Sequence, residues 1–281
     1  MRRFLYLLLL ICLPVVADQR ILYQPLNRDA ALDAGQWRQL WRDTVQQGGR
    51  TLIVQWSRYG DERFGGADGW LANSLREAQA QGLELVVGLH MDSAYYTRID
   101  ELDSAGLAAY WKAQLGESLA QHREVRENWH RKVSGWYLPM ELDDLHFQAT
   151  DRRDALYSQL REFNRKLDKP LHLSAFTAGK LAPGVQARWY AGLAGLGLKL
   201  WWQDGAGTGR LPPLVRQSYA AALPCEVGII REAFRQVSRE GEPFRAVPQN
   251  PIRGVGCHEE AVFALNYRPW ARVLTGSSPI P

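Results

Sequence analysis

Hydrophobic and polar residues follow two alternating patterns from about position 18 onward. Short apolar runs are typical of buried strands, and longer stretches with apolar residues every three or four positions are typical of helices. The patterns predict strands at 21–27, 51–61, 83–92, 133–144, 170–179, 226–234 and 261–270, and a strand that runs into a glycine-rich loop at 198–209. They predict helices at 35–48, 70–82, 104–126, 153–167, 185–195 and 212–223. In the proline-containing region 235–260 we expect an irregular connection with a short helix at most.

Strands that alternate with helices imply βα units on a parallel sheet. Eight such units in about 250 residues are typical of a (β/α)8 barrel. A doubly wound open sheet is the alternative, but it normally has a glycine-rich first turn. The first predicted turn, ILYQPLNRD, contains no glycine. We therefore predict an α/β fold, a single-domain (β/α)8 TIM barrel over residues 18–281.

Residues 1–17 have the three parts of a secretory signal peptide. Arg2 and Arg3 precede an apolar run, and Val15 and Ala17 form a cleavage site. The run is shorter than the roughly 20 residues that span a bilayer, which disfavours an uncleaved anchor. Lipid attachment at Cys12 is a second alternative. We expect secretion across the inner membrane to the periplasm, with no stable membrane insertion after cleavage.

Charge and cysteine content narrow the class of partner. Without Arg2 and Arg3 the chain has 32 basic and 30 acidic residues, and the basic ones are scattered. Nucleic-acid binding requires clustered Lys and Arg, so we expect no nucleic-acid partner. Cys225 and Cys257 remain after signal removal. An even pair in an oxidising compartment predicts a disulfide, with two free thiols as the alternative.

Polar and aromatic residues gather at the carboxyl ends of the predicted strands, where (β/α)8 barrels carry their active sites. The opposite strand ends, such as Leu83 and Val133, are less polar. We predict that ten strand-end residues bind substrate, with aromatic rings stacking on sugars. They are Gln55, Trp56, Arg58, Tyr59, Asp143, Asp144, Trp202, Gln203, Asp204 and Tyr267.

Residues 135–147, GWYLPMELDDLHF, lead an apolar strand into a cluster of three carboxylates. Repulsion and burial make such a cluster costly unless it has a role. Glycoside hydrolysis requires one carboxylic acid to protonate the leaving oxygen and a second carboxylate to attack the sugar or activate water. We predict Glu141 and Glu232 as this catalytic pair. Arg231 or Arg58 would keep Glu232 ionised.

Each assignment has a structural alternative. Glu141 could form a salt bridge with Arg58, and Glu232 could lie on an exposed helix. The two aspartates after Glu141 could cap a loop or helix, and Asp204 could stabilise a turn.

A metal site is an alternative use of His90, Asp92, Asp144 and His146, as in metal-dependent deacetylases. Neither HxxEH nor HExxH occurs in the chain. The nucleophile elbow GxSxG is also absent, and the GAGTG loop lacks the lysine of a phosphate-binding P-loop. We predict no metal and no cofactor.

The motifs GWYLPMELDD, LIVQWSRYGD and LWWQDGAGTG resemble an uncharacterised family of bacterial secreted barrels. That family is classed as a domain of unknown function related to the retaining glycoside hydrolases, and the similarity covers most of the mature chain. The resemblance implies Glu141 as acid/base and Glu232 as nucleophile, and Arg58 matches the arginine after strand two. Where that clan usually has Asn before the acid/base residue, this chain has Met140.

The resulting hypothesis is a secreted barrel that hydrolyses a poly- or oligosaccharide, with retention preferred. A non-catalytic polysaccharide-binding barrel is the main alternative, and a metal-dependent polysaccharide deacetylase is the other. An exopolysaccharide system is a candidate partner.

Overall fold

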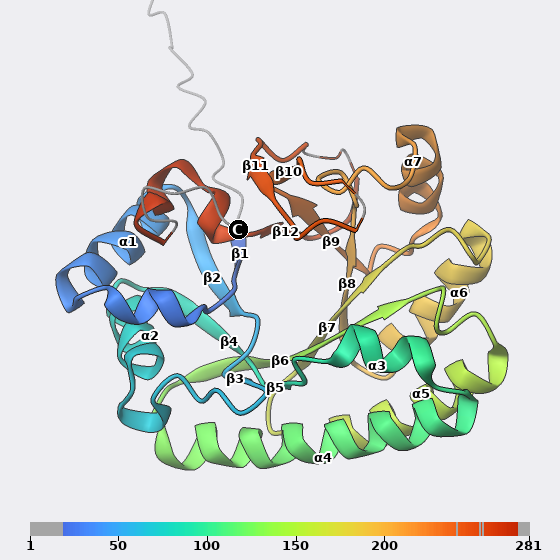
Figure 1. The fold of residues 1–281 in the computed structure, drawn as a ribbon, viewed down its shortest axis with the longest axis horizontal. Coiled ribbons are helices and arrows are strands. Elements are labelled where there is room, and N and C mark those ends of the chain that lie inside the picture. Colours follow the sequence, from blue (N-terminus) through green and yellow to red (C-terminus); the bar gives the residue numbers. More distant parts are fainter. Residues whose placement is uncertain (1–18, 240, 253, 255, 275–281) are drawn as a thin grey trace, which may run out of the picture.

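The computed structural model describes residues 19–239, 241–252, 254 and 256–274. The predicted signal peptide, its cleavage site and Cys12 lie outside the described residues. Eight parallel strands close into a barrel, as Figure 1 shows, and the predicted (β/α)8 barrel is confirmed. Their order is β1 (Gln19–Tyr23), β2 (Gly49–Val54), β4 (Glu84–Gly88), β6 (Val133–Asp143), β7 (Leu171–Phe176), β8 (Lys199–Gln203), β9 (Gly228–Glu232) and β12 (Glu260–Phe263), which returns to β1.

Helices cover the outside of the barrel between successive strands (Figure 1). They are α1 (Ala34–Gln46), α2 (Trp70–Ala80), α4 (Ser104–Asn128), α5 (Thr150–Asn164), α6 (Pro183–Ala194) and α7 (Pro213–Ala222). A short 3-10 helix, η1 (Asn27–Ala31), follows β1, and another, η2 (Gly66–Asp68), precedes α2. After β12, η3 (Leu265–Tyr267) and η4 (Pro269–Leu274) take the place of an eighth α-helix, and η4 packs on α1.

Local sequence explains several helix boundaries. The Asp33 carboxylate accepts from the Gln36 N–H at 2.8 Å, and the Gln36 side chain accepts from the Asp33 N–H at 2.9 Å. This reciprocal capping box starts α1. Asp103 starts α4 by accepting from the Gly106 N–H at 2.7 Å. Gly82 follows α2 with a φ of +94°, a conformation that favours glycine and ends the helix.

Several predicted strands are too long. The strand predicted at 51–61 ends early, and β3 (Arg58–Tyr59) pairs with β5 (His90–Met91) in a separate sheet. The stretch 198–209 has the predicted form, a strand, β8, that runs into a loop whose Gly205 and Gly209 have positive φ. The strand predicted at 261–270 is replaced after β12 by η3 and η4.

Three further elements do not stand out in the sequence pattern. α3 (Tyr95–Glu101) is seven residues long, which is too short for a helical period to be recognised. β10 (Phe234–Gln236) and β11 (Ala246–Pro248) form an antiparallel pair inside 235–260, where the sequence suggests irregular structure.

An apolar layer fills the centre of the barrel. Its buried members are Leu22, Ile53, Val86, Tyr137, Trp201, Ile230 and Ala261. Trp201 fits because Gly228 faces it, since a Cβ at 228 would lie 2.3 Å from the indole. At the amino-terminal end, Glu259 pairs with Arg20 and Lys199 at 3.1 and 3.0 Å. Paired charges therefore close this end of the barrel.

Cys225 and Cys257 form a disulfide with Cα atoms 5.4 Å apart, which confirms the predicted pair. The cysteines precede β9 and β12, so the bridge joins the two ends of the segment that carries β10 and β11. A closed loop of 32 residues corresponds to roughly 3–4 kcal/mol of stabilisation in the chain-entropy model.

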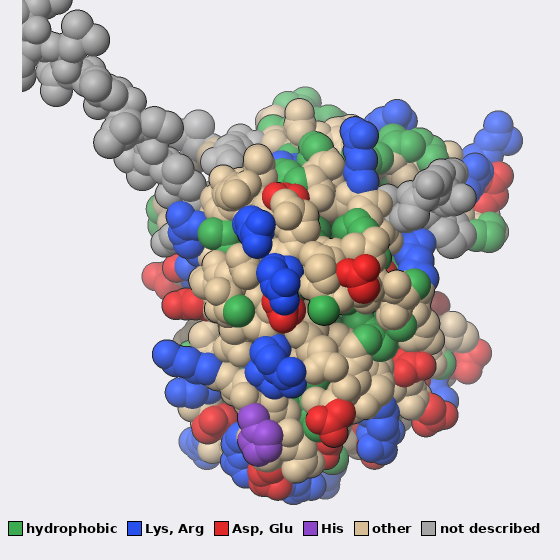
Figure 2. All heavy atoms as spheres, turned by 90° about the vertical axis from the view of Figure 1, so that its left-hand side faces the viewer, with side chains coloured by type: hydrophobic (Ala, Val, Ile, Leu, Met, Phe, Trp, Pro, Cys, Tyr) green, Lys and Arg blue, Asp and Glu red, His purple; other side chains and the backbone are tan. Residues whose placement is uncertain are grey.

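The face that carries α1 and α2 has Lys and Arg side chains interspersed with Asp and Glu side chains (Figure 2). One such contact is the Arg38–Glu77 ion pair, at 3.1 Å. Within the described ranges, the model has no helix with the length and apolar character that crossing a bilayer requires.

Candidate active site

Strand alternation brings three polar side chains to the carboxyl end of the barrel interior. The central apolar layer contains a residue each from β6, β8 and β9. Because side chains alternate between the two faces of a strand, Glu141, Gln203 and Glu232 follow on the interior face. The opposite face of β6 is apolar, with Met140 and Leu142 in the outer core. Two carboxyl groups and an amide thus meet at one end of the barrel.

Side chains from three elements hold Glu141. Its Oε2 accepts a hydrogen bond from the Tyr96 hydroxyl on α3 at 2.5 Å. Its Oε1 accepts from Gln203 Nε2 at 2.6 Å and from the Ser174 hydroxyl at 3.4 Å. The Tyr95 hydroxyl donates to the backbone carbonyl of Glu141 at 2.8 Å. The predicted site residue Gln203 therefore touches the predicted acid/base directly.

The pKa of the Glu141 carboxyl is raised, chiefly because burial disfavours its charged form. The three side-chain donors lower this pKa, and the charge of Asp143 raises it. A carboxyl with a raised pKa retains its proton at higher pH, as a general acid must.

Backbone amides hold Glu232, which is 4 % exposed. Its Oε2 accepts from the N–H groups of Gly207 and Thr208 at 2.5 and 3.1 Å. Glycine is required at 207, because a Cβ there would lie 2.5 Å from the Phe234 carbonyl oxygen and 2.9 Å from Glu232 Oε2. Glu232 ends strand β9, so the alternative of an exposed helix is wrong.

Burial, then the charge of Asp204, raises the pKa of Glu232 to about 7. The amide donors of Gly207 and Thr208 lower this pKa, and the charge of Glu141 raises it. Glu141 and Glu232 are thus electrostatically coupled. A negative charge on Glu141 therefore favours the protonated form of Glu232.

The prediction that Arg231 keeps Glu232 ionised is wrong. Arg231 pairs with Glu260 at 2.7 Å and with Asp204 at 3.6 Å. Asp204 is 6 % exposed, and its Oδ1 accepts from the Ala206 N–H at 3.0 Å and the Glu232 N–H at 3.4 Å. Burial raises the pKa of Asp204. These contacts agree with the turn-stabilising alternative for this residue.

Arg58 also lies away from both glutamates. Its Nη1 pairs with Glu117 on α4 at 3.0 Å, and its Nε donates to the Gly60 carbonyl at 3.1 Å. The predicted alternative of an Arg58–Glu141 salt bridge is therefore wrong, as is the expectation that Arg58 neutralises Glu232. The match of Arg58 to the arginine of retaining glycosidases is correspondingly weakened.

Asp143 and Asp144 are both 0 % exposed. The Asp143 carboxylate accepts from the N–H groups of Leu145 and His146 at 2.9 and 2.7 Å and contacts His146 Nδ1 at 2.8 Å. The Asp144 carboxylate accepts from three backbone amides of the loop after β7. Neither carboxylate reaches solvent, which corrects the prediction of substrate contact in favour of the capping alternative.

The predicted aromatic residues divide into exposed and buried ones. Tyr59 is 36 % exposed and lies 4.8 Å, between ring centroids, from Trp56, whose Nε1 donates to a backbone carbonyl at 3.0 Å. Trp202 is 2 % exposed and donates to Thr177 Oγ1 at 2.8 Å. Tyr267 is 5 % exposed. Trp202 and Tyr267 expose little of their rings, and their stacking on sugar rings stays a prediction.

Six buried amide oxygens lack a partner among the described residues, and two of them, in Gln55 and Asn266, follow the barrel strands β2 and β12. Gln55 Oε1 follows Ile53 on the interior face of β2, and Asn266 Oδ1 lies on η3. An unsatisfied buried acceptor costs about 1–3 kcal/mol. Hydroxyl donors of a ligand would satisfy both atoms.

The four residues of the metal alternative do not converge. His146 contacts Asp143 and Asp100 at 2.8 and 2.7 Å, and Asp92 pairs with Arg98 at 3.1 Å. Across the part of the chain that the structure describes, no group of three or more His, Cys, Asp or Glu side chains could hold a metal ion.

A hollow of about 450 Å³ lies beside the loop that holds Glu232. It is lined by Thr208, Arg210, Gln236 and Ser238. Thr208 also donates its N–H to Glu232, and the Gln236 N–H donates to the Gly207 carbonyl at 2.8 Å. Its volume falls within the range of about 300–1,000 Å³ that is usual for small-ligand sites.

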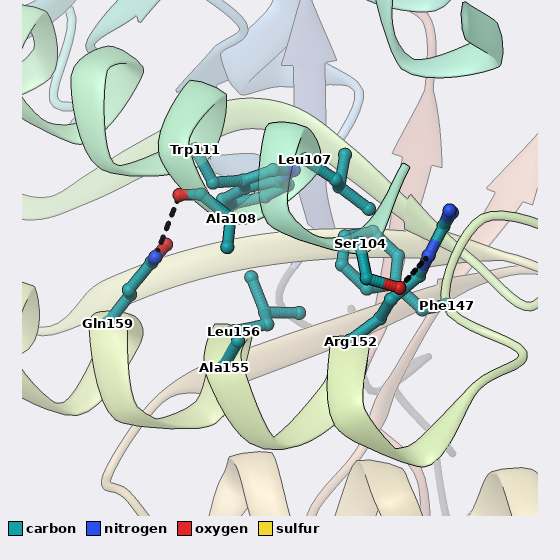
Figure 3. A pocket seen from close by; sticks show the side chains of 9 residues that line it. All are labelled: Ser104, Leu107, Ala108, Trp111, Phe147, Arg152, Ala155, Leu156 and Gln159. Carbon is teal, nitrogen blue, oxygen red and sulfur yellow. Dashed lines mark hydrogen bonds between the residues drawn. The ribbon is translucent and has the colours of Figure 1, made fainter. Parts of the chain in front are cut away.

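A second cavity lies in the outer layer between α4 and α5, where it measures about 10 Å³ (Figure 3). Arg152 Nε donates to Ser104 Oγ at 3.1 Å, and Gln159 Nε2 donates to the Ala108 carbonyl at 2.8 Å. This volume holds at most about one water, so the cavity is a packing defect apart from the carboxylates.

Four groups that contact the glutamates are missing from the sequence-based predictions, namely Tyr95, Tyr96, Ser174 and the amides of the GAGTG loop. Tyr95 and Tyr96 follow the third barrel strand on an unrecognised helix, and the adjacent tyrosine pair was their only signal. The GAGTG motif was considered only as a phosphate cradle. Its amides instead bind a carboxylate of the protein.

The chain is similar to known proteins in sequence and in fold. The uncharacterized protein YbcH of Escherichia coli strain K12 is 31 % identical over 294 residues, which cover 96 % of this chain and 98 % of YbcH. A candidate alpha-L-fucosidase from Bacteroides thetaiotaomicron has a TM-score of 0.57 at 14 % identity, over 92 % of this chain and 90 % of that one. The Bacillus cereus spore cortex-lytic enzyme SleL has a TM-score of 0.49 at 11 % identity, over 83 % of this chain and 55 % of SleL.

The structural likeness to the Bacteroides protein shows a shared fold. Residues 20–253 match the model of a family described as a domain of unknown function, DUF4434. The chain belongs to the DUF4434 family.

Proposed function

We propose that this chain is a secreted glycoside hydrolase that cleaves a poly- or oligosaccharide with retention. The observation that carries the proposal is the coupled pair Glu141 and Glu232 at the carboxyl ends of the fourth and seventh barrel strands. Both face the barrel interior, both have a raised pKa, and the charge of one raises the pKa of the other. One protonated and one ionised carboxyl is the state that the reaction requires.

The surroundings favour Glu232 as nucleophile and Glu141 as acid/base. Two fixed N–H donors lower the pKa of Glu232 and orient its Oε2, and above its pKa of about 7 this carboxyl is ionised and can attack. Glu141 instead contacts a solvent-exposed tyrosine, Tyr96, which is 46 % exposed. A glycosidic oxygen that displaced the Tyr96 hydroxyl would reach Glu141 Oε2 and could take its proton.

The surrounding residues fit a polyhydroxylated substrate. Gln55 Oε1 and Asn266 Oδ1 are acceptors for sugar hydroxyls, and Gln203 on β8 donates to Glu141 Oε1. The exposed rings of Tyr59 and Tyr96 offer faces on which sugars can stack. Secretion to an oxidising compartment is supported by the Cys225–Cys257 disulfide. Periplasmic location and an exopolysaccharide partner stay predictions.

The test is hydrolysis of a polysaccharide panel by the mature protein and by Glu141→Gln and Glu232→Gln. We expect each substitution to lower kcat by about 10³-fold or more, while Glu77→Gln on the remote α2 surface retains the rate. A 2-fluoro glycoside should label Glu232 and leave the Glu232→Gln protein unlabelled.

The other outcomes are equally specific. Product of inverted anomeric configuration, with no labelling, would replace retention by inversion. Hydrolysis that survives both substitutions would refute the catalytic pair. Saccharide binding that persists in every variant, with no hydrolysis by wild type, would favour the non-catalytic binding barrel.

A further inference from the structure

The hollow beside Glu232 has polar walls from two segments. Thr208 and Arg210 come from the loop after β8, and Gln236 and Ser238 come from β10 and the residues that follow it. The loop is held in place from within: Arg216 Nη1 donates to the Asp204 carbonyl at 3.3 Å, and Asp204 binds the loop amide of Ala206. The hollow is therefore a built feature next to the proposed nucleophile.

The hollow contains one unpaired positive charge. Within the described residues, the Arg210 guanidinium forms no hydrogen bond or ion pair. Three acidic residues of the neighbouring segments have other partners: Asp204 pairs with Arg231, Glu242 with Arg245 at 3.3 Å, and Glu232 with two amides. No acidic side chain lines the hollow, so its field favours a negative charge.

The neutral residues of the hollow have free hydrogen-bonding groups. Gln236 Nε2 donates to Ser238 Oγ at 3.2 Å, and the Arg245 N–H donates to the same oxygen at 3.1 Å. The Ser238 hydroxyl proton and Gln236 Oε1 have no partner within the described ranges. One donor and one acceptor beside a cation suit a ligand that carries hydroxyls and an anionic group.

We infer that this hollow is a subsite for a sugar unit that bears a carboxylate, a hexuronate, with Arg210 as its counter-ion. The inference rests on the proposed function only in taking the occupant to be a sugar. A guanidinium matches a carboxylate with two parallel N–H donors. The subsite adjoins Glu232, so it would select acidic over neutral glycans at the unit next to the cleaved bond.

The experiment titrates the mature protein with glucuronic acid and with glucose at pH 7.5, using ligand-observed NMR. Wild type should bind glucuronate at least tenfold more tightly than glucose, and 0.5 M NaCl should remove most of the difference. Arg210→Gln should raise the Kd for glucuronate about tenfold and leave the Kd for glucose unchanged. Arg210→Lys should retain part of the preference.

Arg235→Gln is the matched control. Arg235 is exposed, lies one residue from Gln236, and points to the opposite face of β10. The Arg235→Gln substitution removes the same charge without changing a residue that lines the hollow, so the preference for glucuronate should persist. Equal Kd values for the two sugars, no glucuronate binding up to about 100 mM, or an equal effect of both arginine substitutions would overturn the inference.

Failure of this inference is distinct from failure of the proposed function. Hydrolysis of neutral glycans that depends on Glu141, without an Arg210-dependent preference for glucuronate, rejects the subsite alone. Arg210-dependent binding of glucuronate by a protein that hydrolyses no glycan rejects the hydrolase alone.

Discussion

Glu141 and Glu232 lie at the carboxyl ends of the fourth and seventh strands of the barrel, but they are held by opposite means. Side chains from α3, β7 and β8 surround Glu141. Two consecutive backbone amides of one loop hold Glu232. Side-chain substitutions can therefore change the contacts of Glu141, whereas the contacts of Glu232 depend on the path of the backbone.

A substitution of Gly207 should have the largest effect, because it displaces the backbone amides that hold Glu232. In Gly207→Ala, the new Cβ would lie 2.5 Å from the Phe234 carbonyl oxygen, so the loop must move and carry its two amides away from Glu232. Misplacing a reacting group by about 1 Å costs roughly 100-fold. We therefore expect kcat/KM on any hydrolysed polysaccharide to fall about 100-fold.

Gly192→Ala is the control for this variant, because a Cβ at that position in α6 meets no atom within 4 Å. It should leave the rate unchanged. Near-UV circular dichroism should show that both variants retain the native fold. A folded Gly207→Ala protein with the wild-type rate would mean that the amide pair is dispensable.

The sequence already indicates where the two carboxyls lie, because strand periodicity and the carboxyl-end rule of (β/α)8 barrels locate them without knowledge of the packing. It does not indicate what surrounds them. Arg58 can reach several acids, and its actual partner, Glu117, lies 59 positions away on α4. Nothing local distinguishes such a partner from Glu141.

Strand phase explains another part of the difference. One of two adjacent tryptophans in β8 must face outward, and the central layer contains Trp201. Trp202 therefore packs under the helices. Tyr96 escaped prediction because α3 is too short to show a helical period. Local pattern thus predicts the strands and their ends, while long-range contacts decide which polar groups meet.

The pH dependence of the free energy of unfolding tests a second property of Glu232, its raised pKa. The pKa of Glu232 is raised from 4.5 to about 7, so between these pH values the folded protein holds a proton that the unfolded chain has released. The free energy of unfolding contributed by this group is full below pH 4.5 and falls as pH rises through 7. A shift of this size corresponds to about 3 kcal/mol.

Glu232→Gln removes this titration. Urea unfolding at pH 4.5, 6 and 8 should show the variant gaining stability relative to wild type as pH rises, by up to about 3 kcal/mol. Glu101→Gln, which removes an exposed carboxyl from α3, is the control. A difference between variant and wild type that is constant across this range would show that Glu232 is not a buried, proton-retaining group.

The smallest effect is expected at Glu141, the carboxyl that side chains hold. In Tyr96→Phe, Glu141 Oε2 loses a hydrogen bond that lowers its pKa, so the pKa of Glu141 should rise. Tyr96 is half-exposed, and water can replace its hydroxyl, so we expect kcat/KM to fall only about fivefold, equivalent to about 1 kcal/mol. The basic limb of the pH profile of kcat/KM should move to higher pH, because Glu141 stays protonated to higher pH.

Tyr59→Phe, which removes another exposed phenol hydroxyl, is the control and should leave the basic limb of the pH profile in place. If both variants leave it in place, Tyr96 does not tune Glu141, and the adjustable half of the comparison fails while the backbone-held half stands.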